Sequence, residues 1–286
     1  MTAVILKSAP YVEEIREDIL REVGILKSRE IAPRLDVVLV GEDPGSVWYA
    51  NSKAKIGAKL GIEVEIHKLP SAATQEEVHN LVIELNNDES VHGILVELPL
   101  PKHLDKSKIL NAILPVKDVD GVTAANRGFI LGGQEEQALI AATPLSCIEL
   151  IARAGVDLRG KRVTLVGRGD TVGRPLSMLL IKRDATITVC HTKTVNLAEE
   201  CLRAEVLVAA AGARNLVTRE MVSPGTVVID AGVNETEDGG FTGDVDFGPV
   251  SEVAGAITPV PGGVGSLTTT LLMRNVLRAI ELQGLN

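Results

Sequence analysis

Short apolar runs alternate with helix-like segments along almost the whole chain. The runs are four to seven residues long and lie at 35–40, 62–66, 93–96, 162–166, 185–189, 205–211 and 226–232. Continuous apolar runs of this length are typical of strands buried on both faces, and the amphipathic segments between them are typical of covering helices. The pattern predicts an α/β fold with parallel sheets.

Apolar spacing and end signals locate several helices between these runs. Residues 11–27 carry apolar side chains on one helical face. Thr74 followed by Glu77 is a capping box that begins a helix. Thr143 and Pro144 supply an N-cap and a proline at the first helical position. Each helix lies between two strand-like runs, as expected for crossover connections.

The segment 120–142 separates two sets of strands. It contains no strand-like run and is rich in Gly and Gln. We therefore predict two α/β domains that meet there. The first consists of 1–142 together with 266–286, because the last helix, near 267–282, is expected to pack back on it. The second, 143–265, is predicted to be a Rossmann-like, doubly wound parallel sheet.

Composition and charge exclude several classes of function. The net charge of -9 argues against a general affinity for nucleic acid. No apolar run approaches the ~20 residues that a membrane helix needs, and the N-terminus has too few apolar residues for a signal peptide. The three cysteines form no CxxC pair and the five histidines no HExxH motif. We expect a cytoplasmic protein that holds no metal.

The strongest local motif is a glycine-rich turn between a strand and a helix. Gly167, Gly169 and Gly173 give the pattern GxGxxxG directly after the run 162–166. Such a turn lets the backbone approach a pyrophosphate, which then binds at the N-terminus of the helix. Glycines also close ordinary strand–helix turns, and that interpretation stays open. The strand before the turn and the run 185–189 after the helix favour a dinucleotide site.

The residues after the next strand indicate which dinucleotide. An NAD enzyme usually has an acidic residue there to bind the ribose hydroxyls. Here the strand ends in CHTKT (190–194), which contains no acid. Arg168, Thr192 and Lys193 could bind a 2′-phosphate instead, so the sequence favours NADP. Lys193 would also be unremarkable as a solvated loop lysine.

The first domain contains a tyrosine, a lysine and an oddly placed carboxylate. Tyr49 and Lys53 lie four residues apart and project from one face of a predicted helix that ends at Gly61. A lysine shielded from water can donate or accept a proton, although this spacing is also common on ordinary exposed helices. Glu97 follows the buried run 93–96 and is costly to desolvate unless it has a partner.

Seven motifs, in the same order over nearly the whole chain, resemble the bifunctional methylenetetrahydrofolate dehydrogenase/methenyltetrahydrofolate cyclohydrolase family. They are YANSK (49–53), GILVELPLP (93–101), KDVDG (117–121), GRGDTVGRP (167–175), CHTKT (190–194), DAGVN (230–234) and PGGVG (261–265). The resemblance implies two α/β domains with a folate cleft between them and a homodimer joined through the nucleotide domains. It also implies a multifunctional enzyme of one-carbon metabolism that supports purine biosynthesis.

Two reactions follow from the resemblance. The first is NADP-dependent oxidation of 5,10-methylenetetrahydrofolate by hydride transfer, which needs no metal when the nicotinamide lies over the pterin. The second is hydrolysis of the methenyl product to 10-formyltetrahydrofolate. A dehydrogenase that lacks the hydrolysis, a dinucleotide-sensing module and a dehydrogenase for another small metabolite are the alternatives. A sensor would have no need of a proton-handling lysine.

Residue roles are also implied by the resemblance alone. Lys53 is expected to move protons during hydrolysis, Tyr49 to pack on the folate and order Lys53, and Asp120 to accept hydrogen bonds from the pterin. Val233 is expected to contact the cofactor, together with the glycine-rich turn. The folate site is expected to be lined by Pro261, Gly262 and Gly263.

The chain departs from the family pattern at three positions. Glu97 replaces a glutamine that is expected to hydrogen-bond the catalytic lysine, Ser266 replaces a proline, and Gly169 stands where many relatives have serine. A carboxylate beside Lys53 favours the ammonium form, which cannot accept a proton. We hypothesise that Glu97 faces Lys53 and weakens hydrolysis while hydride transfer survives. Glu97 acting as the base itself, and Glu97 facing solvent, are the alternatives.

Overall fold

The computed structural model describes residues 2–237 and 239–285, which form two compact units. The small-sheet unit contains residues 14–142 and the chain from 269 onward. The large-sheet unit contains residues 143–268 and the chain up to residue 13. Two long helices, α1 (Ala9–Ser28) and α10 (Val264–Leu282), begin in the large-sheet unit and continue in the other.

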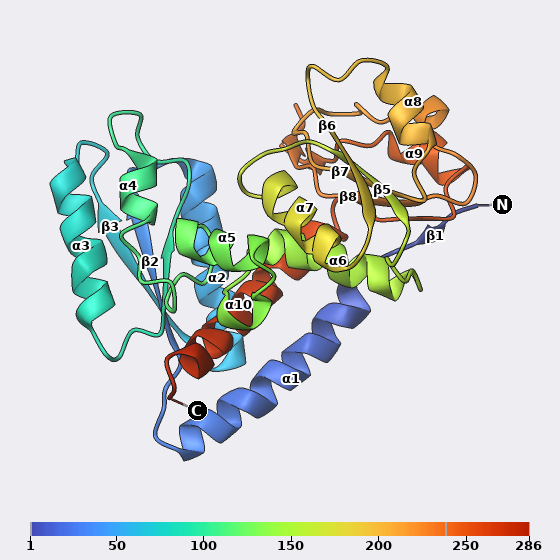
Figure 1. The fold of residues 1–286 in the computed structure, drawn as a ribbon. Coiled ribbons are helices and arrows are strands. Elements are labelled where there is room, and N and C mark those ends of the chain that lie inside the picture. Colours follow the sequence, from blue (N-terminus) through green and yellow to red (C-terminus); the bar gives the residue numbers. More distant parts are fainter. Residues whose placement is uncertain (1, 238, 286) are drawn as a thin grey trace. The chain divides into compact units, whose positions relative to one another are not determined.

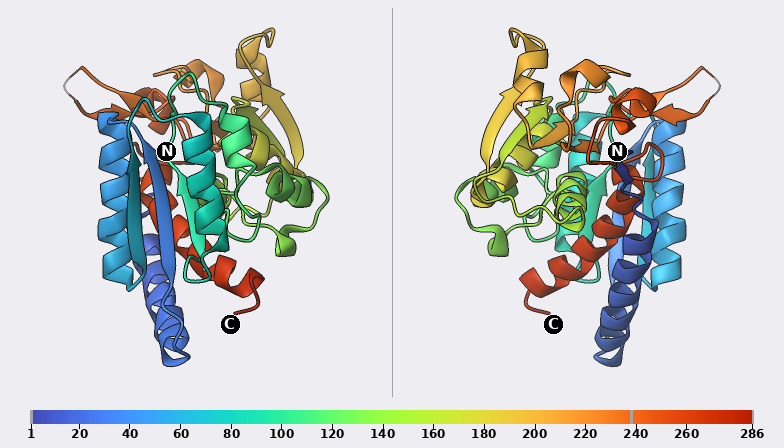
Figure 2. Two further views of the ribbon diagram at one scale, coloured as in Figure 1. Left: turned by 90° about the vertical axis from the view of Figure 1, so that its left-hand side faces the viewer. Right: turned by 90° about the vertical axis from the view of Figure 1, so that its right-hand side faces the viewer.

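The small-sheet unit contains three parallel strands in the order β3-β2-β4. They are β2 (Arg34–Val40), β3 (Glu63–Leu69) and β4 (Gly93–Val96). Its helices are α2 (Pro44–Leu60), α3 (Gln75–Asn87), α4 (Lys106–Leu110) and α5 (Ala124–Leu131), with a 3-10 turn η1 (Glu135–Gln137). Figures 1 and 2 show α2 and α3 on opposite faces of this sheet. β4 is buried throughout, whereas the edge strand β3 is partly exposed.

The large-sheet unit contains a six-stranded parallel sheet in the order β1-β11-β8-β7-β5-β6. The strands are β1 (Val4–Ile5), β5 (Arg162–Val166), β6 (Thr186–Cys190), β7 (Val206–Ala209), β8 (Val227–Asp230) and β11 (Ala256–Ile257). Further elements are α6 (Ala142–Arg153), α7 (Gly173–Lys182), α8 (Leu197–Leu202), α9 (Phe247–Ser251), the turn η2 (Arg219–Met221) and the hairpin of β9 (Asn234–Glu235) and β10 (Phe241–Thr242). In Figure 1, α6 and α7 cover one face of the sheet, and α8 and α9 the other.

The predicted fold class is confirmed, and each of the seven apolar runs overlaps one strand. The capping box is present: Glu77 N donates to Thr74 Oγ1 and Thr74 N donates to the Glu77 carboxylate. The apolar face predicted for residues 11–27 is buried at all five of its positions, Val12, Ile15, Ile19, Val23 and Leu26. The segment 120–142 contains no strand, but it contains α5, which Thr123 caps at its N-terminus.

The observed units differ from the predicted division at the N-terminus. The prediction grouped residues 1–142 together, whereas the chain up to residue 13 belongs to the large-sheet unit. The reason is β1, which pairs in parallel with β11 through Val4↔Ala256 and Ile5↔Ile257. In the described residues no helix has both the length and the apolar character needed to cross a bilayer.

Candidate active site

Glu97 faces Lys53 and not solvent. Lys53 Nζ donates a hydrogen bond to Glu97 Oε1 over 2.6 Å, and the two side chains are only 13% and 8% exposed. The alternative of a solvent-facing Glu97 is therefore wrong. A carboxylate at the end of a buried strand is tolerated here because an ammonium group compensates its charge.

Local structure fixes the two ends of this ion pair. The backbone N–H of Glu97 donates to Val38 O over 2.9 Å, which continues the ladder between β4 and β2 beyond the end of β4. At the start of α2, Asp43 Oδ2 accepts hydrogen bonds from the backbone N and the hydroxyl of Ser46, both 2.9 Å. α2 ends at Gly61, which has φ +74°. Lys53 therefore projects from a helix that is capped at both ends.

Two aromatic rings accompany Lys53 on α2. Lys53 Nζ lies 5.7 Å from the centroid of the Tyr49 ring, within the range of a cation–π contact. The Trp48 and Tyr49 rings meet edge to face with centroids 5.0 Å apart. Both are unusually exposed for aromatic residues, at 60% for Trp48 and 43% for Tyr49. Trp48 could not be predicted as part of this cluster, because a single tryptophan outside any motif carries no signal of its contacts.

Asp120 is a half-buried acid whose ionisation is disfavoured. Burial, followed by the negative charges of Asp118 and Glu97, raises its pKa to about 7, while Lys53 and Arg127 oppose this shift. Electrostatic coupling thus joins Asp120 to both members of the Lys53–Glu97 pair. A carboxyl group with this pKa exchanges protons near neutral pH, which suits acid–base chemistry.

The three charged residues of the motif KDVDG (117–121) differ in how exposed they are. Lys117 and Asp118 are buried, at 5% and 0% exposure, while Asp120 remains partly accessible. Among these charged residues, the resemblance implies a role for Asp120 alone. The burial of the other two charges could not be predicted, because it depends on partners in α3 and α5.

In the large-sheet unit, two of the three motif glycines are sterically required. Gly167 has φ +120°, and a Cβ there would lie 2.1 Å from Ala210 O. A Cβ on Gly173 would lie 2.4 Å from Gly167 O, whereas one on Gly169 would meet no atom within 4 Å among the described residues. No described side chain caps the N-terminus of α7 at Val172. Arg174 N donates to Gly169 O over 3.0 Å and Pro175 has no N–H, so among the first three residues of α7 only the Gly173 N–H could reach a phosphate.

The residues predicted to bind the 2′-phosphate lie at one edge of the large sheet. β5 and β6 are paired in parallel, with Val166 opposite Cys190, so Arg168 and Lys193 both follow the carboxyl ends of neighbouring strands. A tight turn follows β6, in which His191 N donates to Thr194 Oγ1 over 2.8 Å. Arg168, Thr192 and Lys193 are exposed. The arrangement supplies two cations beside the glycine-rich turn.

Two further loops predicted for cofactor and folate also belong to the large-sheet unit. Val233, which follows β8, is 51% exposed. In the loop at Pro261, Gly262 has φ +101°, and its carbonyl accepts hydrogen bonds from the backbone N (2.9 Å) and hydroxyl (3.0 Å) of Ser8. A Cβ on Gly263 would lie 2.5 Å from Pro259 O. Ser8 was missed because it lies 254 positions from the loop that it fixes.

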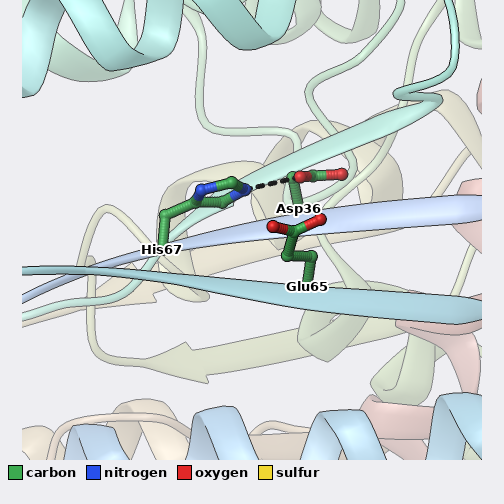
Figure 3. A group of neighbouring side chains, drawn as sticks. All are labelled: Asp36, Glu65 and His67. Carbon is green, nitrogen blue, oxygen red and sulfur yellow. Dashed lines mark hydrogen bonds and ion pairs between the residues drawn. The ribbon is translucent and has the colours of Figure 1, made fainter.

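One cluster has metal-ligand chemistry, but both of its carboxylates already bind a guanidinium group. Asp36, Glu65 and His67 have ligand atoms within 4.8 Å of one another (Figure 3). Arg34 Nε donates to Asp36 over 2.8 Å and Arg34 Nη2 to Glu65 over 2.7 Å, while His67 Nε2 lies 2.6 Å from Asp36 Oδ1. The guanidinium group of Arg34 therefore already supplies the positive charge that a metal ion would contribute.

Comparison with known proteins gives a consistent result over the whole chain. Residues 6–120 match the catalytic domain, and residues 141–284 the NAD(P)-binding domain, of tetrahydrofolate dehydrogenase/cyclohydrolase. The chain is 53% identical over 284 residues to the bifunctional protein FolD of Heliobacterium modesticaldum, covering 99% of this chain and 98% of the relative. It is 51% identical over 282 residues to that of Pelotomaculum thermopropionicum, covering 99% of each.

Solved structures agree. The bifunctional enzyme FolD from Campylobacter jejuni is 39% identical with a TM-score of 0.96, covering 98% of this chain and 99% of that one. The Trypanosoma brucei methylenetetrahydrofolate dehydrogenase-cyclohydrolase, solved with NADP and an inhibitor, is 34% identical with a TM-score of 0.93, covering 99% of each chain. This chain belongs to the tetrahydrofolate dehydrogenase/cyclohydrolase family.

Proposed function

We propose that the protein oxidises 5,10-methylenetetrahydrofolate with NADP and hydrolyses the resulting 5,10-methenyltetrahydrofolate to 10-formyltetrahydrofolate. The observation that carries this proposal is the shielded Lys53–Glu97 pair beside Tyr49, in the part of the chain that matches the family's catalytic domain. The relatives at 53% and 51% identity are named as bifunctional. These names favour both activities over a dehydrogenase that lacks the hydrolysis.

The large-sheet unit supplies the cofactor site. NADP, when bound, accepts a hydride from the methylene carbon of the folate. Gly167 and Gly173 permit the backbone approach that a pyrophosphate needs, since side chains at either position would collide with the backbone. Arg168 and Lys193 supply positive charge for the 2′-phosphate, and the Trypanosoma brucei relative was solved with NADP. Val233 is assigned to the same site.

The small-sheet unit supplies the proton-handling groups for hydrolysis. Water adds to the methenyl carbon and loses both of its protons overall: one reaches the ring nitrogen whose bond to that carbon breaks, and the other is released to solvent. Lys53 is assigned to move the proton that reaches the ring nitrogen, with Tyr49 packing on the folate and Asp120 binding the pterin. Because Glu97 Oε1 lies 2.6 Å from Lys53 Nζ, it holds the amine of Lys53 in an ion pair and thereby restrains the transfer. The alternative outcome is that Glu97 itself accepts the proton.

The loop at Pro261, Gly262 and Gly263 is assigned to the folate site. Its backbone conformation is held by Ser8 through the Gly262 carbonyl. Gly263 cannot carry a side chain without a shift of the backbone at Pro259. We infer that the loop presents backbone groups to the substrate at close range.

We also propose that the protein is a cytoplasmic homodimer that supplies one-carbon units for purine biosynthesis. β6 is the terminal strand of the large sheet, and Val189 on this strand is 37% exposed. Such an edge can pair with a second copy. The three buried free cysteines are compatible with a reducing compartment. Light scattering after size-exclusion chromatography would measure the mass in solution, and a mass near 30 kDa would contradict the dimer.

A paired rate assay tests the proposed function. NADPH formation is followed with 5,10-methylenetetrahydrofolate and NADP or NAD, and the decay of 5,10-methenyltetrahydrofolate is followed separately. We expect both reactions, with NADP preferred over NAD. Absence of NADPH formation with this folate would contradict the proposed dehydrogenase, and decay of the methenyl compound at the uncatalysed rate would contradict the hydrolase.

A further inference from the structure

Asp118 is a buried carboxylate held by neutral donors. It is 0% exposed, and its Oδ1 accepts a hydrogen bond from Val122 N over 3.1 Å. Its Oδ2 accepts from Thr123 N over 2.8 Å and from Asn126 Nδ2 over 2.9 Å. All three of these donors are amide groups; burial outweighs their hydrogen bonds and raises the pKa of Asp118. Such an arrangement is costly to keep and calls for a functional explanation.

The hydrogen bonds of Asp118 extend into a network around the same loop. Asn126, also fully buried, donates to Pro115 O over 2.9 Å and accepts from Leu139 N over 3.0 Å. Its amide therefore has a fixed orientation. A carboxylate at position 118 matches that orientation, because Asn126 already presents its NH2 group there.

Flanking residues are fixed by partners elsewhere in the small-sheet unit. The ammonium group of Lys117 donates to three carbonyls at the end of α3, those of Leu85 (3.3 Å), Asn86 (2.9 Å) and Asp88 (2.7 Å). Asn275 on α10 donates to Val119 O and Ile140 O, both over 2.7 Å. The backbone on the N-terminal side of Asp120 is thus held at every residue from 117 to 119.

The C-terminal side of Asp120 is equally constrained. Gly121 has φ +61°, and a Cβ there would lie 2.6 Å from Ala141 N. Gly121 N donates to Asp118 O over 3.0 Å, which closes the turn. Asp120 is thus the one acid of this turn that is partly accessible, on a backbone with little freedom to move.

Charged groups from four segments act on Asp120. Asp118 from its own turn and Glu97 after β4 are negative, while Lys53 on α2 and Arg127 on α5 are positive. Lys53 and Glu97 compensate each other across 2.6 Å, and Arg127 is half-buried and hence partly screened by water. Asp118, within the described network, has no cation to compensate it.

We propose that Asp118 is a positioning residue of this site, whose hydrogen bonds hold the turn that aims Asp120 and whose buried carboxyl group acts on Asp120 from the same turn. The proposal rests on the proposed function, in which Asp120 binds the folate. A protonated carboxyl group can both donate and accept hydrogen bonds, whereas an ionised one only accepts. Asp118 thereby selects which hydrogen bonds Asp120 can offer the pterin.

A titration of Asp120 by NMR tests the electrostatic effect of Asp118 on Asp120 without any substrate. The protein is labelled with ¹³C at aspartate carboxyls, and the Asp120 signal is identified by its loss in Asp120→Asn. The wild type should titrate near pH 7. Asp118→Asn should lower the midpoint by about half a pH unit or more, and Arg127→Gln should raise it. Asp36→Asn, which removes an equally buried carboxylate paired with Arg34 and His67, should leave it unchanged.

Kinetic measurements on the same variants test whether Asp118 positions Asp120 for the reaction. Asp118→Asn should lower kcat for methylenetetrahydrofolate oxidation at least about ten-fold at every pH, and its kcat profile should shift in the direction of the NMR midpoint. A purely structural role predicts lost stability with an unshifted titration, as expected for Asp36→Asn. Unchanged kcat in folded Asp118→Asn would overturn the positioning role.

Failure of the inference and of the proposed function are distinguishable. An inactive wild type with an Asp120 midpoint near 7 contradicts the function and leaves the electrostatic inference standing. An active wild type whose Asp120 titrates below about pH 5, close to an ordinary aspartate, overturns the inference. If Asp118→Asn does not fold, the proposal is tested by the Asp120 midpoint in the wild type and by its change in Arg127→Gln. An Asp120 midpoint that falls or stays constant in Arg127→Gln contradicts the proposal.

Discussion

Replacing Glu97 by glutamine should release Lys53 from its ion pair. In the wild type the two charged groups are 2.6 Å apart and almost fully shielded from water. At the effective dielectric constant of ~20 that suits partly buried pairs, contact charges attract by about 4 kcal/mol. Glutamine keeps a hydrogen-bond acceptor but removes the charge, so we expect the attraction between the two side chains to weaken by roughly 1–3 kcal/mol.

The weaker ion pair should affect hydrolysis more than hydride transfer. About 1.4 kcal/mol corresponds to a factor of ten, so Glu97→Gln should hydrolyse methenyltetrahydrofolate about ten-fold faster at pH 7. Dehydrogenase activity should change less than about three-fold, because hydride transfer depends mainly on the placement of cofactor and folate. Removing the ion pair should also lower the unfolding free energy by about 1–3 kcal/mol.

The assay is the decay of methenyltetrahydrofolate, measured from pH 6 to 9 alongside NADPH formation. Glu65→Gln is a matched control, because it neutralises a glutamate of the same sheet that pairs with Arg34 and is 49% exposed. The control should leave the ratio of the two activities unchanged. If Glu97→Gln is no faster than wild type at any pH, the restraint is refuted. If it is slower at every pH, Glu97 is the base.

Two further predictions concern the other site residues. Asp120→Asn should be more stable than wild type above pH 7. The wild-type carboxyl has a pKa of about 7 when folded and 3.8 as a reference value, so folding becomes less favourable as pH rises between them, by up to about 4 kcal/mol before solvent screening. Urea unfolding at pH 5 and pH 8 checks this, and an equal difference from wild type at both pH values would contradict it. Arg168→Gln and Lys193→Gln should each raise KM for NADP about five- to ten-fold and leave KM for NAD unchanged; a parallel rise for both cofactors would argue against a 2′-phosphate contact.

Much of the fold could be predicted from the sequence, because most of its strands coincide with short continuous apolar runs. The run 93–96 is buried at every position in β4, and the capping box at Thr74 forms as expected. Local signals fail for short elements. The strand Val4–Ile5 is only two residues long, and its pairing with residues 256–257 places the N-terminus in the large-sheet unit. Nothing in so short a run reveals a partner about 250 residues away.

The main residues of the candidate site could be predicted, but the buried residues that hold them in place could not. The position of Glu97 after a buried strand indicated that it needs a partner, and the resemblance to the family implied that this partner is Lys53. The buried charges of Lys117 and Asp118 did not follow, because charges adjacent to a turn normally lie at the surface. Their partners on α3 and α5 are set by tertiary packing, which spacing along the chain does not encode.

The account depends most directly on Lys53 as the group that moves the proton in hydrolysis. Lys53→Gln removes the amine but can still donate a hydrogen bond to Glu97, and Lys55→Gln, an exposed lysine on the same helix, is its control. The decisive measurement is the ratio of methenyltetrahydrofolate hydrolysis to NADPH formation in these two variants. We expect hydrolysis to fall at least about 100-fold in Lys53→Gln while dehydrogenase activity persists, and no change of the ratio in Lys55→Gln. Hydrolysis at the wild-type rate in folded Lys53→Gln would contradict the account.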